Sequence, residues 1–202
     1  MNPIKLAKPD HPIQPALADR WSPYCFSDKP VSDADLRSVF EAARWAPSSY
    51  NEQPWSYLVA AKADAKEFER LLSCLVEGNQ AWAKDAPVLA IGCTSLNFQR
   101  NGKPNSAALH DLGLASASLT MEATARGLVV HQMIGIVPER VRELYQVPEG
   151  VQPLTGLAIG YAGDPSQANE KLRERDQTPR SRKKLTEFVF GGTWGTKASV
   201  VP

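Results

Sequence analysis

Apolar and polar residues recur along this chain with two different periods, and these predict where helices and strands form. After the capping-box-like start at 32–35, apolar residues recur at i, i+3, i+4 and i+7 over 36–43, which predicts an amphipathic helix that runs into Pro47. Similar patterns predict further helices at 64–78, 105–126 and 138–145. Short apolar runs predict strands at 55–61, 87–94, 128–133 and 153–161. The pattern therefore supports a fold with both helices and strands.

The glycines of the last predicted strand do not form a dinucleotide-binding turn. Gly156, Gly160 and Gly163 have the wrong spacing for a Gly-x-Gly-x-x-Gly motif, and Pro165 stands where a helix should open. The sequence therefore disfavours a Rossmann site.

Charge and cysteine content narrow the class of protein. The 202 residues suit one domain, and the net charge of +1 gives no global field for nucleic acid or an anionic membrane. The three cysteines include no Cys-x-x-Cys pair, so we expect free thiols in a reducing compartment and no metal site. The first residues lack the apolar run of a signal peptide, and no stretch reaches the ~20 apolar residues of a membrane span. We expect a cytoplasmic protein without nucleic-acid or membrane partners.

Both ends of the chain differ from its middle. Residues 1–19 carry four prolines and no periodic pattern, so we expect an irregular arm. Residues 170–184 hold seven basic and three acidic residues, a mixture typical of a solvated face rather than a nucleic-acid groove. The tail 185–202 contains Phe188, Phe190 and Trp194. It is too apolar to stay free, and we expect it to dock on another surface.

The most informative stretch is the polar loop between Pro47 and Pro54. The two prolines restrict the backbone at its ends, and the residues between them offer hydroxyl and amide groups without one aliphatic side chain. Trp45 and Trp55 flank the loop. Such a loop suits a flat ligand with polar edges, and it suits a turn rich in Ser and Asn equally well.

The residues around this loop resemble a known family signature. The segment Ala42-Ala43-Arg44-Trp45-Ala46-Pro47-Ser48-Ser49, followed by Asn51 and Gln53-Pro54-Trp55, resembles that of the nitroreductase family of FMN-dependent oxidoreductases. The resemblance continues in family order from Arg20 to about Trp194. It implies an α+β nitroreductase-like fold, with a central mixed β-sheet flanked by helices. It also implies one FMN-binding domain over 1–202, and an intertwined homodimer in which the tail 185–202 docks on the partner subunit.

The resemblance implies cofactor contacts along the whole chain. It assigns the flavin phosphate and ribityl chain to Arg20, Ser22 and Arg182, and flavin N5 to the Gly135 amide. The family usually has a basic residue two positions after the serine, and Tyr24 stands there in this chain. The full implied set is Arg20, Ser22, Pro47, Ser48, Ser49, Asn51, Gln53, Asn79, Ile134, Gly135, Arg180 and Arg182. The serines and Asn51 of the loop would serve the ribityl chain and ring edge in the site of the opposite subunit.

The implied activity is a ping-pong reaction. NADH or NADPH gives hydride to N5 of FMN and leaves, and a nitroaromatic, quinone or similar small-molecule acceptor is then reduced. We assign no catalytic side chain, because the flavin carries the chemistry. His110 and Asp111 are helix neighbours that point about 100° apart, so we expect no dyad. We interpret His131 as a structural residue of a half-buried strand.

Other functions remain open at this stage. One alternative is an FMN-binding protein without reductase turnover. Another is a dehalogenase, dehydrogenase or flavin-fragmenting enzyme of the same fold. A third is a module that binds a partner through its basic tail.

Overall fold

The computed structural model describes residues 3–202, apart from the side chain of Gln167. Within these residues one sheet has the strand order β1-β2-β4-β3, with β1 at Trp55–Ala61, β2 at Val88–Ser95, β3 at Val129–Met133 and β4 at Val151–Gly160. The helices are α1 Pro15–Asp19, α2 Asp33–Arg44, α3 Ala65–Leu72, α4 Glu77–Ala83, α5 Ala108–Ala125, α6 Pro138–Tyr145 and α7 Glu170–Gln177. Short 3-10 turns occur at Pro3–Lys5, Ser49–Asn51, Pro165–Gln167 and Leu185–Glu187. Both helices and strands are present, and the predicted α+β class is confirmed.

The sheet differs from the mixed sheet that the resemblance implied. Each pair of neighbouring strands in the described part of the chain is antiparallel. Strands β2 and β3 run in the same direction, but β4 lies between them and hydrogen-bonds to both. The two parallel strands therefore never pair, and this is why the predicted mixed sheet is wrong.

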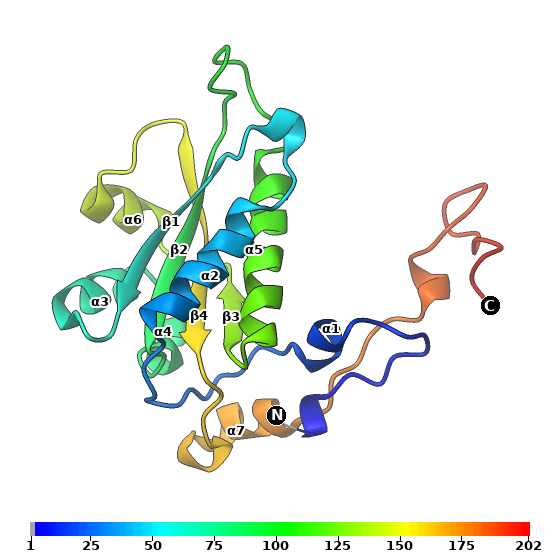
Figure 1. Cartoon of the computed structure of the whole chain (residues 1–202), viewed down its shortest axis with the longest axis horizontal. Coiled ribbons are helices and arrows are strands. Elements are labelled where there is room, and N and C mark those ends of the chain that lie inside the picture. The colour runs from blue at the N-terminus through cyan, green and yellow to red at the C-terminus, as the bar shows by residue number, and fades with distance from the viewer. Residues whose placement is uncertain (1–2) are drawn as a thin grey trace.

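Helices cover both faces of the sheet (Figure 1). Helices α2 and α5 enclose one core with residues such as Val39 and Leu119, and α3, α4 and α6 enclose the other with Leu71 and Val141. Strand β2 is buried along 88–94, since alternate side chains of a strand enter both cores. Helix α5 thus has one side fixed against the sheet.

The predicted helix at 64–78 is wrong in its second half. Helix α3 begins after its cap Asp64 as expected, but it ends at Leu72. The following residues pair with the segment after β3: Val76 N–H donates to the Gly135 carbonyl at 3.1 Å, and Val137 N–H donates to the Cys74 carbonyl at 2.7 Å. This long-range pairing interrupts the apolar helical pattern. A new helix, α4, then begins at Glu77.

Other predicted boundaries agree within a few residues. The Ser32 hydroxyl accepts from Asp35 N–H at the start of α2, and strand β1 has the predicted bounds. Helix α5 begins three residues later than expected, because Asn105 forms a turn in which its side chain accepts from Ala107 N–H. The arm 1–19 is mostly irregular in its described part, but it contains the short helix α1.

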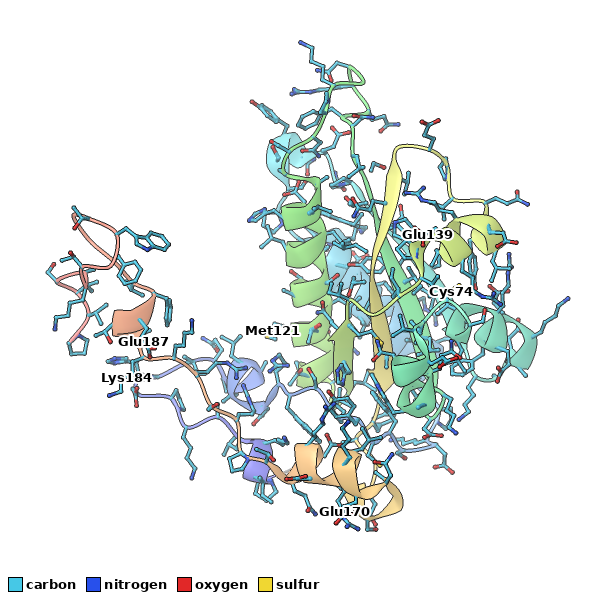
Figure 2. All side chains as sticks on the ribbon, turned by 180° about the vertical axis from the view of Figure 1, so that it is seen from behind. Cys74, Met121, Glu139, Glu170, Lys184 and Glu187 are labelled. Atoms are coloured by element: carbon cyan, nitrogen blue, oxygen red, sulfur yellow. The ribbon has the colours of Figure 1, made fainter. Side chains whose placement is uncertain are left out.

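The tail leaves the body of the protein beyond α7, as Figures 1 and 2 show for the segment that carries Lys184 and Glu187. Two of its aromatic residues are exposed in the single chain, Phe188 at 56% and Trp194 at 93%, and Phe190 is half-buried. Among the described helices, none has the length and hydropathy needed to cross a membrane.

Candidate functional site

The polar loop 48–53 has a strained backbone. Tyr50, Asn51 and Gln53 have φ angles of 53°, 57° and 52°. This left-handed region costs a residue other than glycine on the order of 1 kcal/mol, and Tyr and Gln tolerate it less well than Asn. The Ser48 hydroxyl closes the loop by accepting from Gln53 N–H at 3.0 Å. Strain that is held by such contacts is typical of ligand-binding segments.

A buried carboxylate anchors this loop to α5. Asp111 is 1% exposed, and its Oδ2 accepts from Ser49 N–H at 3.0 Å. Its Oδ1 lies 3.3 Å from Nδ1 of His110, so the expectation that these neighbours do not meet is wrong. The His110 side chain is 71% exposed, so this contact lies at the surface of the helix. Asp111 is thus a site residue that the sequence interpretation missed.

A second group lies where α4 meets the segment after β3. The Asn79 amide donates to the Gly135 carbonyl at 2.9 Å, and it does so from inside α4 rather than from a turn after a helix. A Cβ at position 135 would lie 2.4 Å from Asn79 Nδ2, so a larger residue here would displace the Asn79 amide. Because 74–76 pairs with 135–137, these two residues meet across 56 positions of sequence.

The backbone at Gly135 presents a free donor. Ile136 N–H donates to the Ile134 carbonyl at 2.7 Å, which makes a tight turn centred on Gly135. No acceptor within residues 3–202 takes the Gly135 N–H. The neighbouring Ile134 side chain is 71% exposed. A flat ligand placed here would meet an apolar side chain and one unpaired amide donor.

The third group consists of arginines. Arg20 donates to the Ser22 hydroxyl at 3.3 Å, and its pKa lies below the usual value because of burial and the nearby positive charges of Arg180 and Arg182. Within the described residues, no carboxylate forms an ion pair with any of the three. Three guanidinium groups without a carboxylate favour a bound anion such as a phosphate.

Arg180 and Arg182 have different roles in this group. Arg180 holds the N-terminal arm, because it donates to the carbonyls of Lys5 and Ala18 at 3.0 and 2.7 Å. Arg182 is exposed, and among residues 3–202 it donates only to the adjacent Ser181 carbonyl. Arg182 is therefore the better candidate ligand of an anion.

The position of Tyr24 brings another cation into this region. Arg175 donates to the Tyr24 hydroxyl at 3.1 Å, and its guanidinium carbon lies 5.2 Å from the centre of the ring. The Tyr24 backbone N–H donates to Asp176, which adjoins Arg175 on α7. Arg175 is 151 residues away in sequence, and no local signal identifies it.

Behind Tyr24 lies a half-buried histidine. His131 Nδ1 hydrogen-bonds to the Pro23 carbonyl at 2.7 Å, and its ring lies 4.4 Å from that of Trp82. Burial lowers the pKa of His131 below its usual value. These contacts agree with the interpretation of His131 as a structural residue.

The predicted residues do not meet at one place within the chain. They form a loop group of Pro47, Ser48, Ser49, Asn51 and Gln53, a central group of Asn79, Ile134 and Gly135, and an arginine group of Arg20, Ser22, Arg180 and Arg182. The loop group is fixed to Asp111 near the start of α5, whereas Arg20 lines a cavity with Thr124 near its end. These positions on α5 are about 20 Å apart at 1.5 Å per residue. In Figure 1 the cyan turn of the loop group lies near the upper end of α5, and α1, which Arg20 follows directly, lies beside the lower end of α5.

The described residues hold no cluster of three or more His, Cys, Asp or Glu side chains that could bind a metal ion. The site therefore consists of backbone donors, hydroxyl and amide groups, and arginines.

Comparison with known proteins identifies a matching family and similar proteins. The model described as "Nitroreductase family" matches residues 17–161. A Mycolicibacterium smegmatis protein of 15.4 kDa, described as uncharacterized, is 37% identical over 135 residues, which cover 67% of this chain and 89% of that protein. A Bacillus subtilis protein named FMN reductase (NAD(P)H) is 28% identical over 198 residues, which cover 86% of this chain and 77% of that protein.

A solved structure extends the similarity to the fold. It is described as an oxidoreductase containing FMN, and it superposes with a TM-score of 0.88 at 35% identity. The superposition covers 94% of this chain and 96% of that chain.

Proposed function

This chain belongs to the nitroreductase family, and we propose that it is an FMN-dependent oxidoreductase. It takes hydride from NADH or NADPH and passes it in a ping-pong reaction to a nitroaromatic, a quinone or a similar small molecule. The similarity to the FMN reductase and to the FMN-containing oxidoreductase supports this proposal. The observation in this chain that carries it is the arginine group around Arg20 and Ser22, which no carboxylate among the described residues neutralises.

The residues present fit FMN. When it is bound, FMN supplies the hydride acceptor and donor of the reaction. Arg20 and Arg182 would neutralise its phosphate, and Ser22 would donate a hydroxyl hydrogen bond. Gly135 would donate its unpaired N–H to the edge of the ring, and Ile136 N–H, which donates to the Ile134 carbonyl of the same peptide unit, keeps this amide in its direction.

A second copy of the chain would complete each site. The loop group and the arginine group lie near opposite ends of α5, so one loop cannot serve the arginines of its own chain without a large rearrangement. The side of α5 away from the sheet has exposed Gly113 and Ala117, with Met121 on the same side (Figure 2). Small residues allow close helix packing, and we propose that this side meets the partner subunit. The exposed aromatic tail 185–202 would dock on the same partner.

The remaining parts of the proposal concern the whole chain. We propose that residues 1–202 act as one domain whose N-terminal arm is held by Arg180. The three cysteines are free thiols, which supports a cytoplasmic location.

The visible spectrum of the purified protein tests the function most directly. We expect a yellow protein that loses its flavin absorbance when NADH or NADPH is added without oxygen and regains it when a quinone is added. A yellow protein that neither coenzyme bleaches would be a flavin-binding protein without turnover. A colourless protein that binds no added FMN would contradict the proposal altogether. Removal of 185–202 should shift the protein from dimer to monomer in sedimentation.

A further inference from the structure

A cationic loop stands beside the strained loop 48–53. Residues 96–104 turn back on themselves: Phe98 N–H donates to the Lys103 carbonyl, and Gly102 N–H to the Phe98 carbonyl, both at 2.8 Å. The loop carries Arg100 and Lys103 and contains no Asp or Glu. In Figure 1 it is the green loop at the top, next to the cyan turn Ser49–Asn51.

Three contacts join the two loops. The rings of Tyr50 and Phe98 meet edge to face at 5.9 Å between centres. The guanidinium carbon of Arg100 lies 4.3 Å from the centre of the Tyr50 ring and 5.1 Å from that of Phe98. Gln99 N–H donates to the Glu52 carboxylate at 2.5 Å, which ties the backbone of one loop to a side chain of the other. The position of Arg100 is thus coupled to the loop that we place in the flavin site.

The charge of Arg100 lacks a partner. Within residues 3–202 no carboxylate forms an ion pair with Arg100. A guanidinium group that lies over aromatic rings can still donate through the N–H groups along its edge, which carboxylates and phosphates bind. Tyr50 is 75% exposed and supplies a flat surface next to these donors. An aromatic surface and a neighbouring guanidinium together suit a planar molecule that carries an oxyanion.

We propose that Arg100 and Tyr50 form a specificity subsite, which binds the oxyanion of the substrate at the entrance of the flavin site. This proposal rests on the proposed function, because it requires loop 48–53 to line that site. Lys103 adds positive charge to the same loop. Two substrates could carry the oxyanion, namely a coenzyme with a 2′-phosphate or an aromatic acceptor with a carboxylate. In both cases Arg100 makes the enzyme prefer the more anionic of two otherwise similar substrates.

The test compares the yellow wild-type enzyme with Arg100→Ala and Arg100→Lys. Benzoate, which the flavin cannot reduce, serves as the binding probe, and its dissociation constant is measured from the change that it causes in the flavin spectrum. The acceptor arm is the ratio of kcat/KM for 4-nitrobenzoate to that for nitrobenzene. The coenzyme arm is the ratio of kcat/KM for NADPH to that for NADH. Lys66→Ala, which removes an exposed cation of α3, is the matched control.

We expect Arg100→Ala to weaken benzoate binding and to lower at least one of the two ratios, each roughly tenfold, as for the loss of one charge-assisted hydrogen bond. The ratio that falls identifies the source of the oxyanion. Arg100→Lys should fall between wild type and Arg100→Ala, because Lys keeps the charge but not the planar group. Lys66→Ala should change none of these values.

Two results would overturn the subsite. One is wild-type enzyme that bleaches with NADH or NADPH but does not bind benzoate. The other is an Arg100→Ala enzyme with wild-type affinity and wild-type ratios in both arms. In either case the flavin chemistry would remain in place, so the failure of the subsite is distinct from a failure of the proposed function.

Discussion

Replacing Asp111 by alanine should release the strained loop from α5. The carboxylate accepts from Ser49 N–H at 3.0 Å in a place where Asp111 is 1% exposed. A backbone donor that loses its buried acceptor costs about 1–3 kcal/mol. Three residues of the loop hold left-handed φ angles at a cost on the order of 1 kcal/mol each, and they gain by relaxing once the anchor is gone.

This free energy converts into a change in FMN affinity. A loss of about 2 kcal/mol lowers the ratio of closed to relaxed loop about 30-fold, since 1.4 kcal/mol corresponds to a factor of ten. If only the closed loop binds FMN, the apparent dissociation constant rises by up to the same factor. Titration of the apoprotein with FMN, followed by quenching of flavin fluorescence, measures this constant. Urea unfolding of the apoprotein measures the accompanying loss of stability.

Asp111→Asn is the matched control. Its side-chain carbonyl can still accept from Ser49 N–H, so we expect a clearly smaller effect on both measurements. An alanine variant that binds FMN within about twofold of wild type would refute the role of the anchor, because the loop would then hold its shape without it.

Three further substitutions test other parts of the site. A Cβ at Gly135 would lie 2.4 Å from Asn79 Nδ2, so Gly135→Ala should destabilise the protein by about 1–3 kcal/mol in urea unfolding. The same substitution should cost less in a protein that already carries Asn79→Ala, because the crowded side chain is then absent. Equal losses of stability in the two backgrounds would contradict this contact. Arg182→Ala should weaken FMN binding about tenfold with little change in Tm, and unchanged affinity would remove Arg182 from the site. Burial lowers the pKa of His131 in the folded protein. The stability that neutral His131 contributes is therefore complete above the pKa of the unfolded chain, near 6.5, and it is lost as the pH falls through the folded pKa. The loss is at most about 1.4 kcal/mol per pH unit. His131→Asn should therefore be less sensitive to acid than wild type between pH 7 and 5, and equal slopes would refute this role of His131. The raised pKa of Asp176 acts in the opposite sense, because a carboxyl that binds its proton more readily in the folded protein stabilises that protein as the pH falls.

Local signals predicted the parts of the fold that depend on neighbouring residues. Helix α2 begins where Ser32 caps it, and β1 follows Pro54 as expected. The predicted helix at 64–78 failed, because Val76 and Val137 form hydrogen bonds with distant segments that outweigh an apolar helical pattern. The strand order could not be deduced either. It depends on β4, the last strand in sequence, entering between β2 and β3.

The same distinction holds for the site. The family signature identified the polar loop, but it did not show what holds the loop in place. In the sequence Asp111 stands out only as a neighbour of His110, whereas in the structure it accepts from the N–H of Ser49, 62 residues away. Arg175 was missed because it reaches the site through Tyr24, where the family usually has a cation. Side chains that act through another residue leave no spacing pattern that a sequence can reveal.

In a single protomer, the groups next to both ends of α5 are held in energetically unfavourable arrangements. Relief of these arrangements would couple cofactor binding to dimer formation. At its start, loop 48–53 holds three left-handed residues, and near its end Arg20 lies close to two other arginines without a carboxylate partner. An anion bound to the arginines relieves their repulsion, and a ring packed against the loop keeps the strained conformation occupied. If the two ends of each site come from different subunits, one FMN molecule supplies both effects at once. FMN then favours the dimer by the same free energy by which the dimer favours FMN, because linkage is reciprocal.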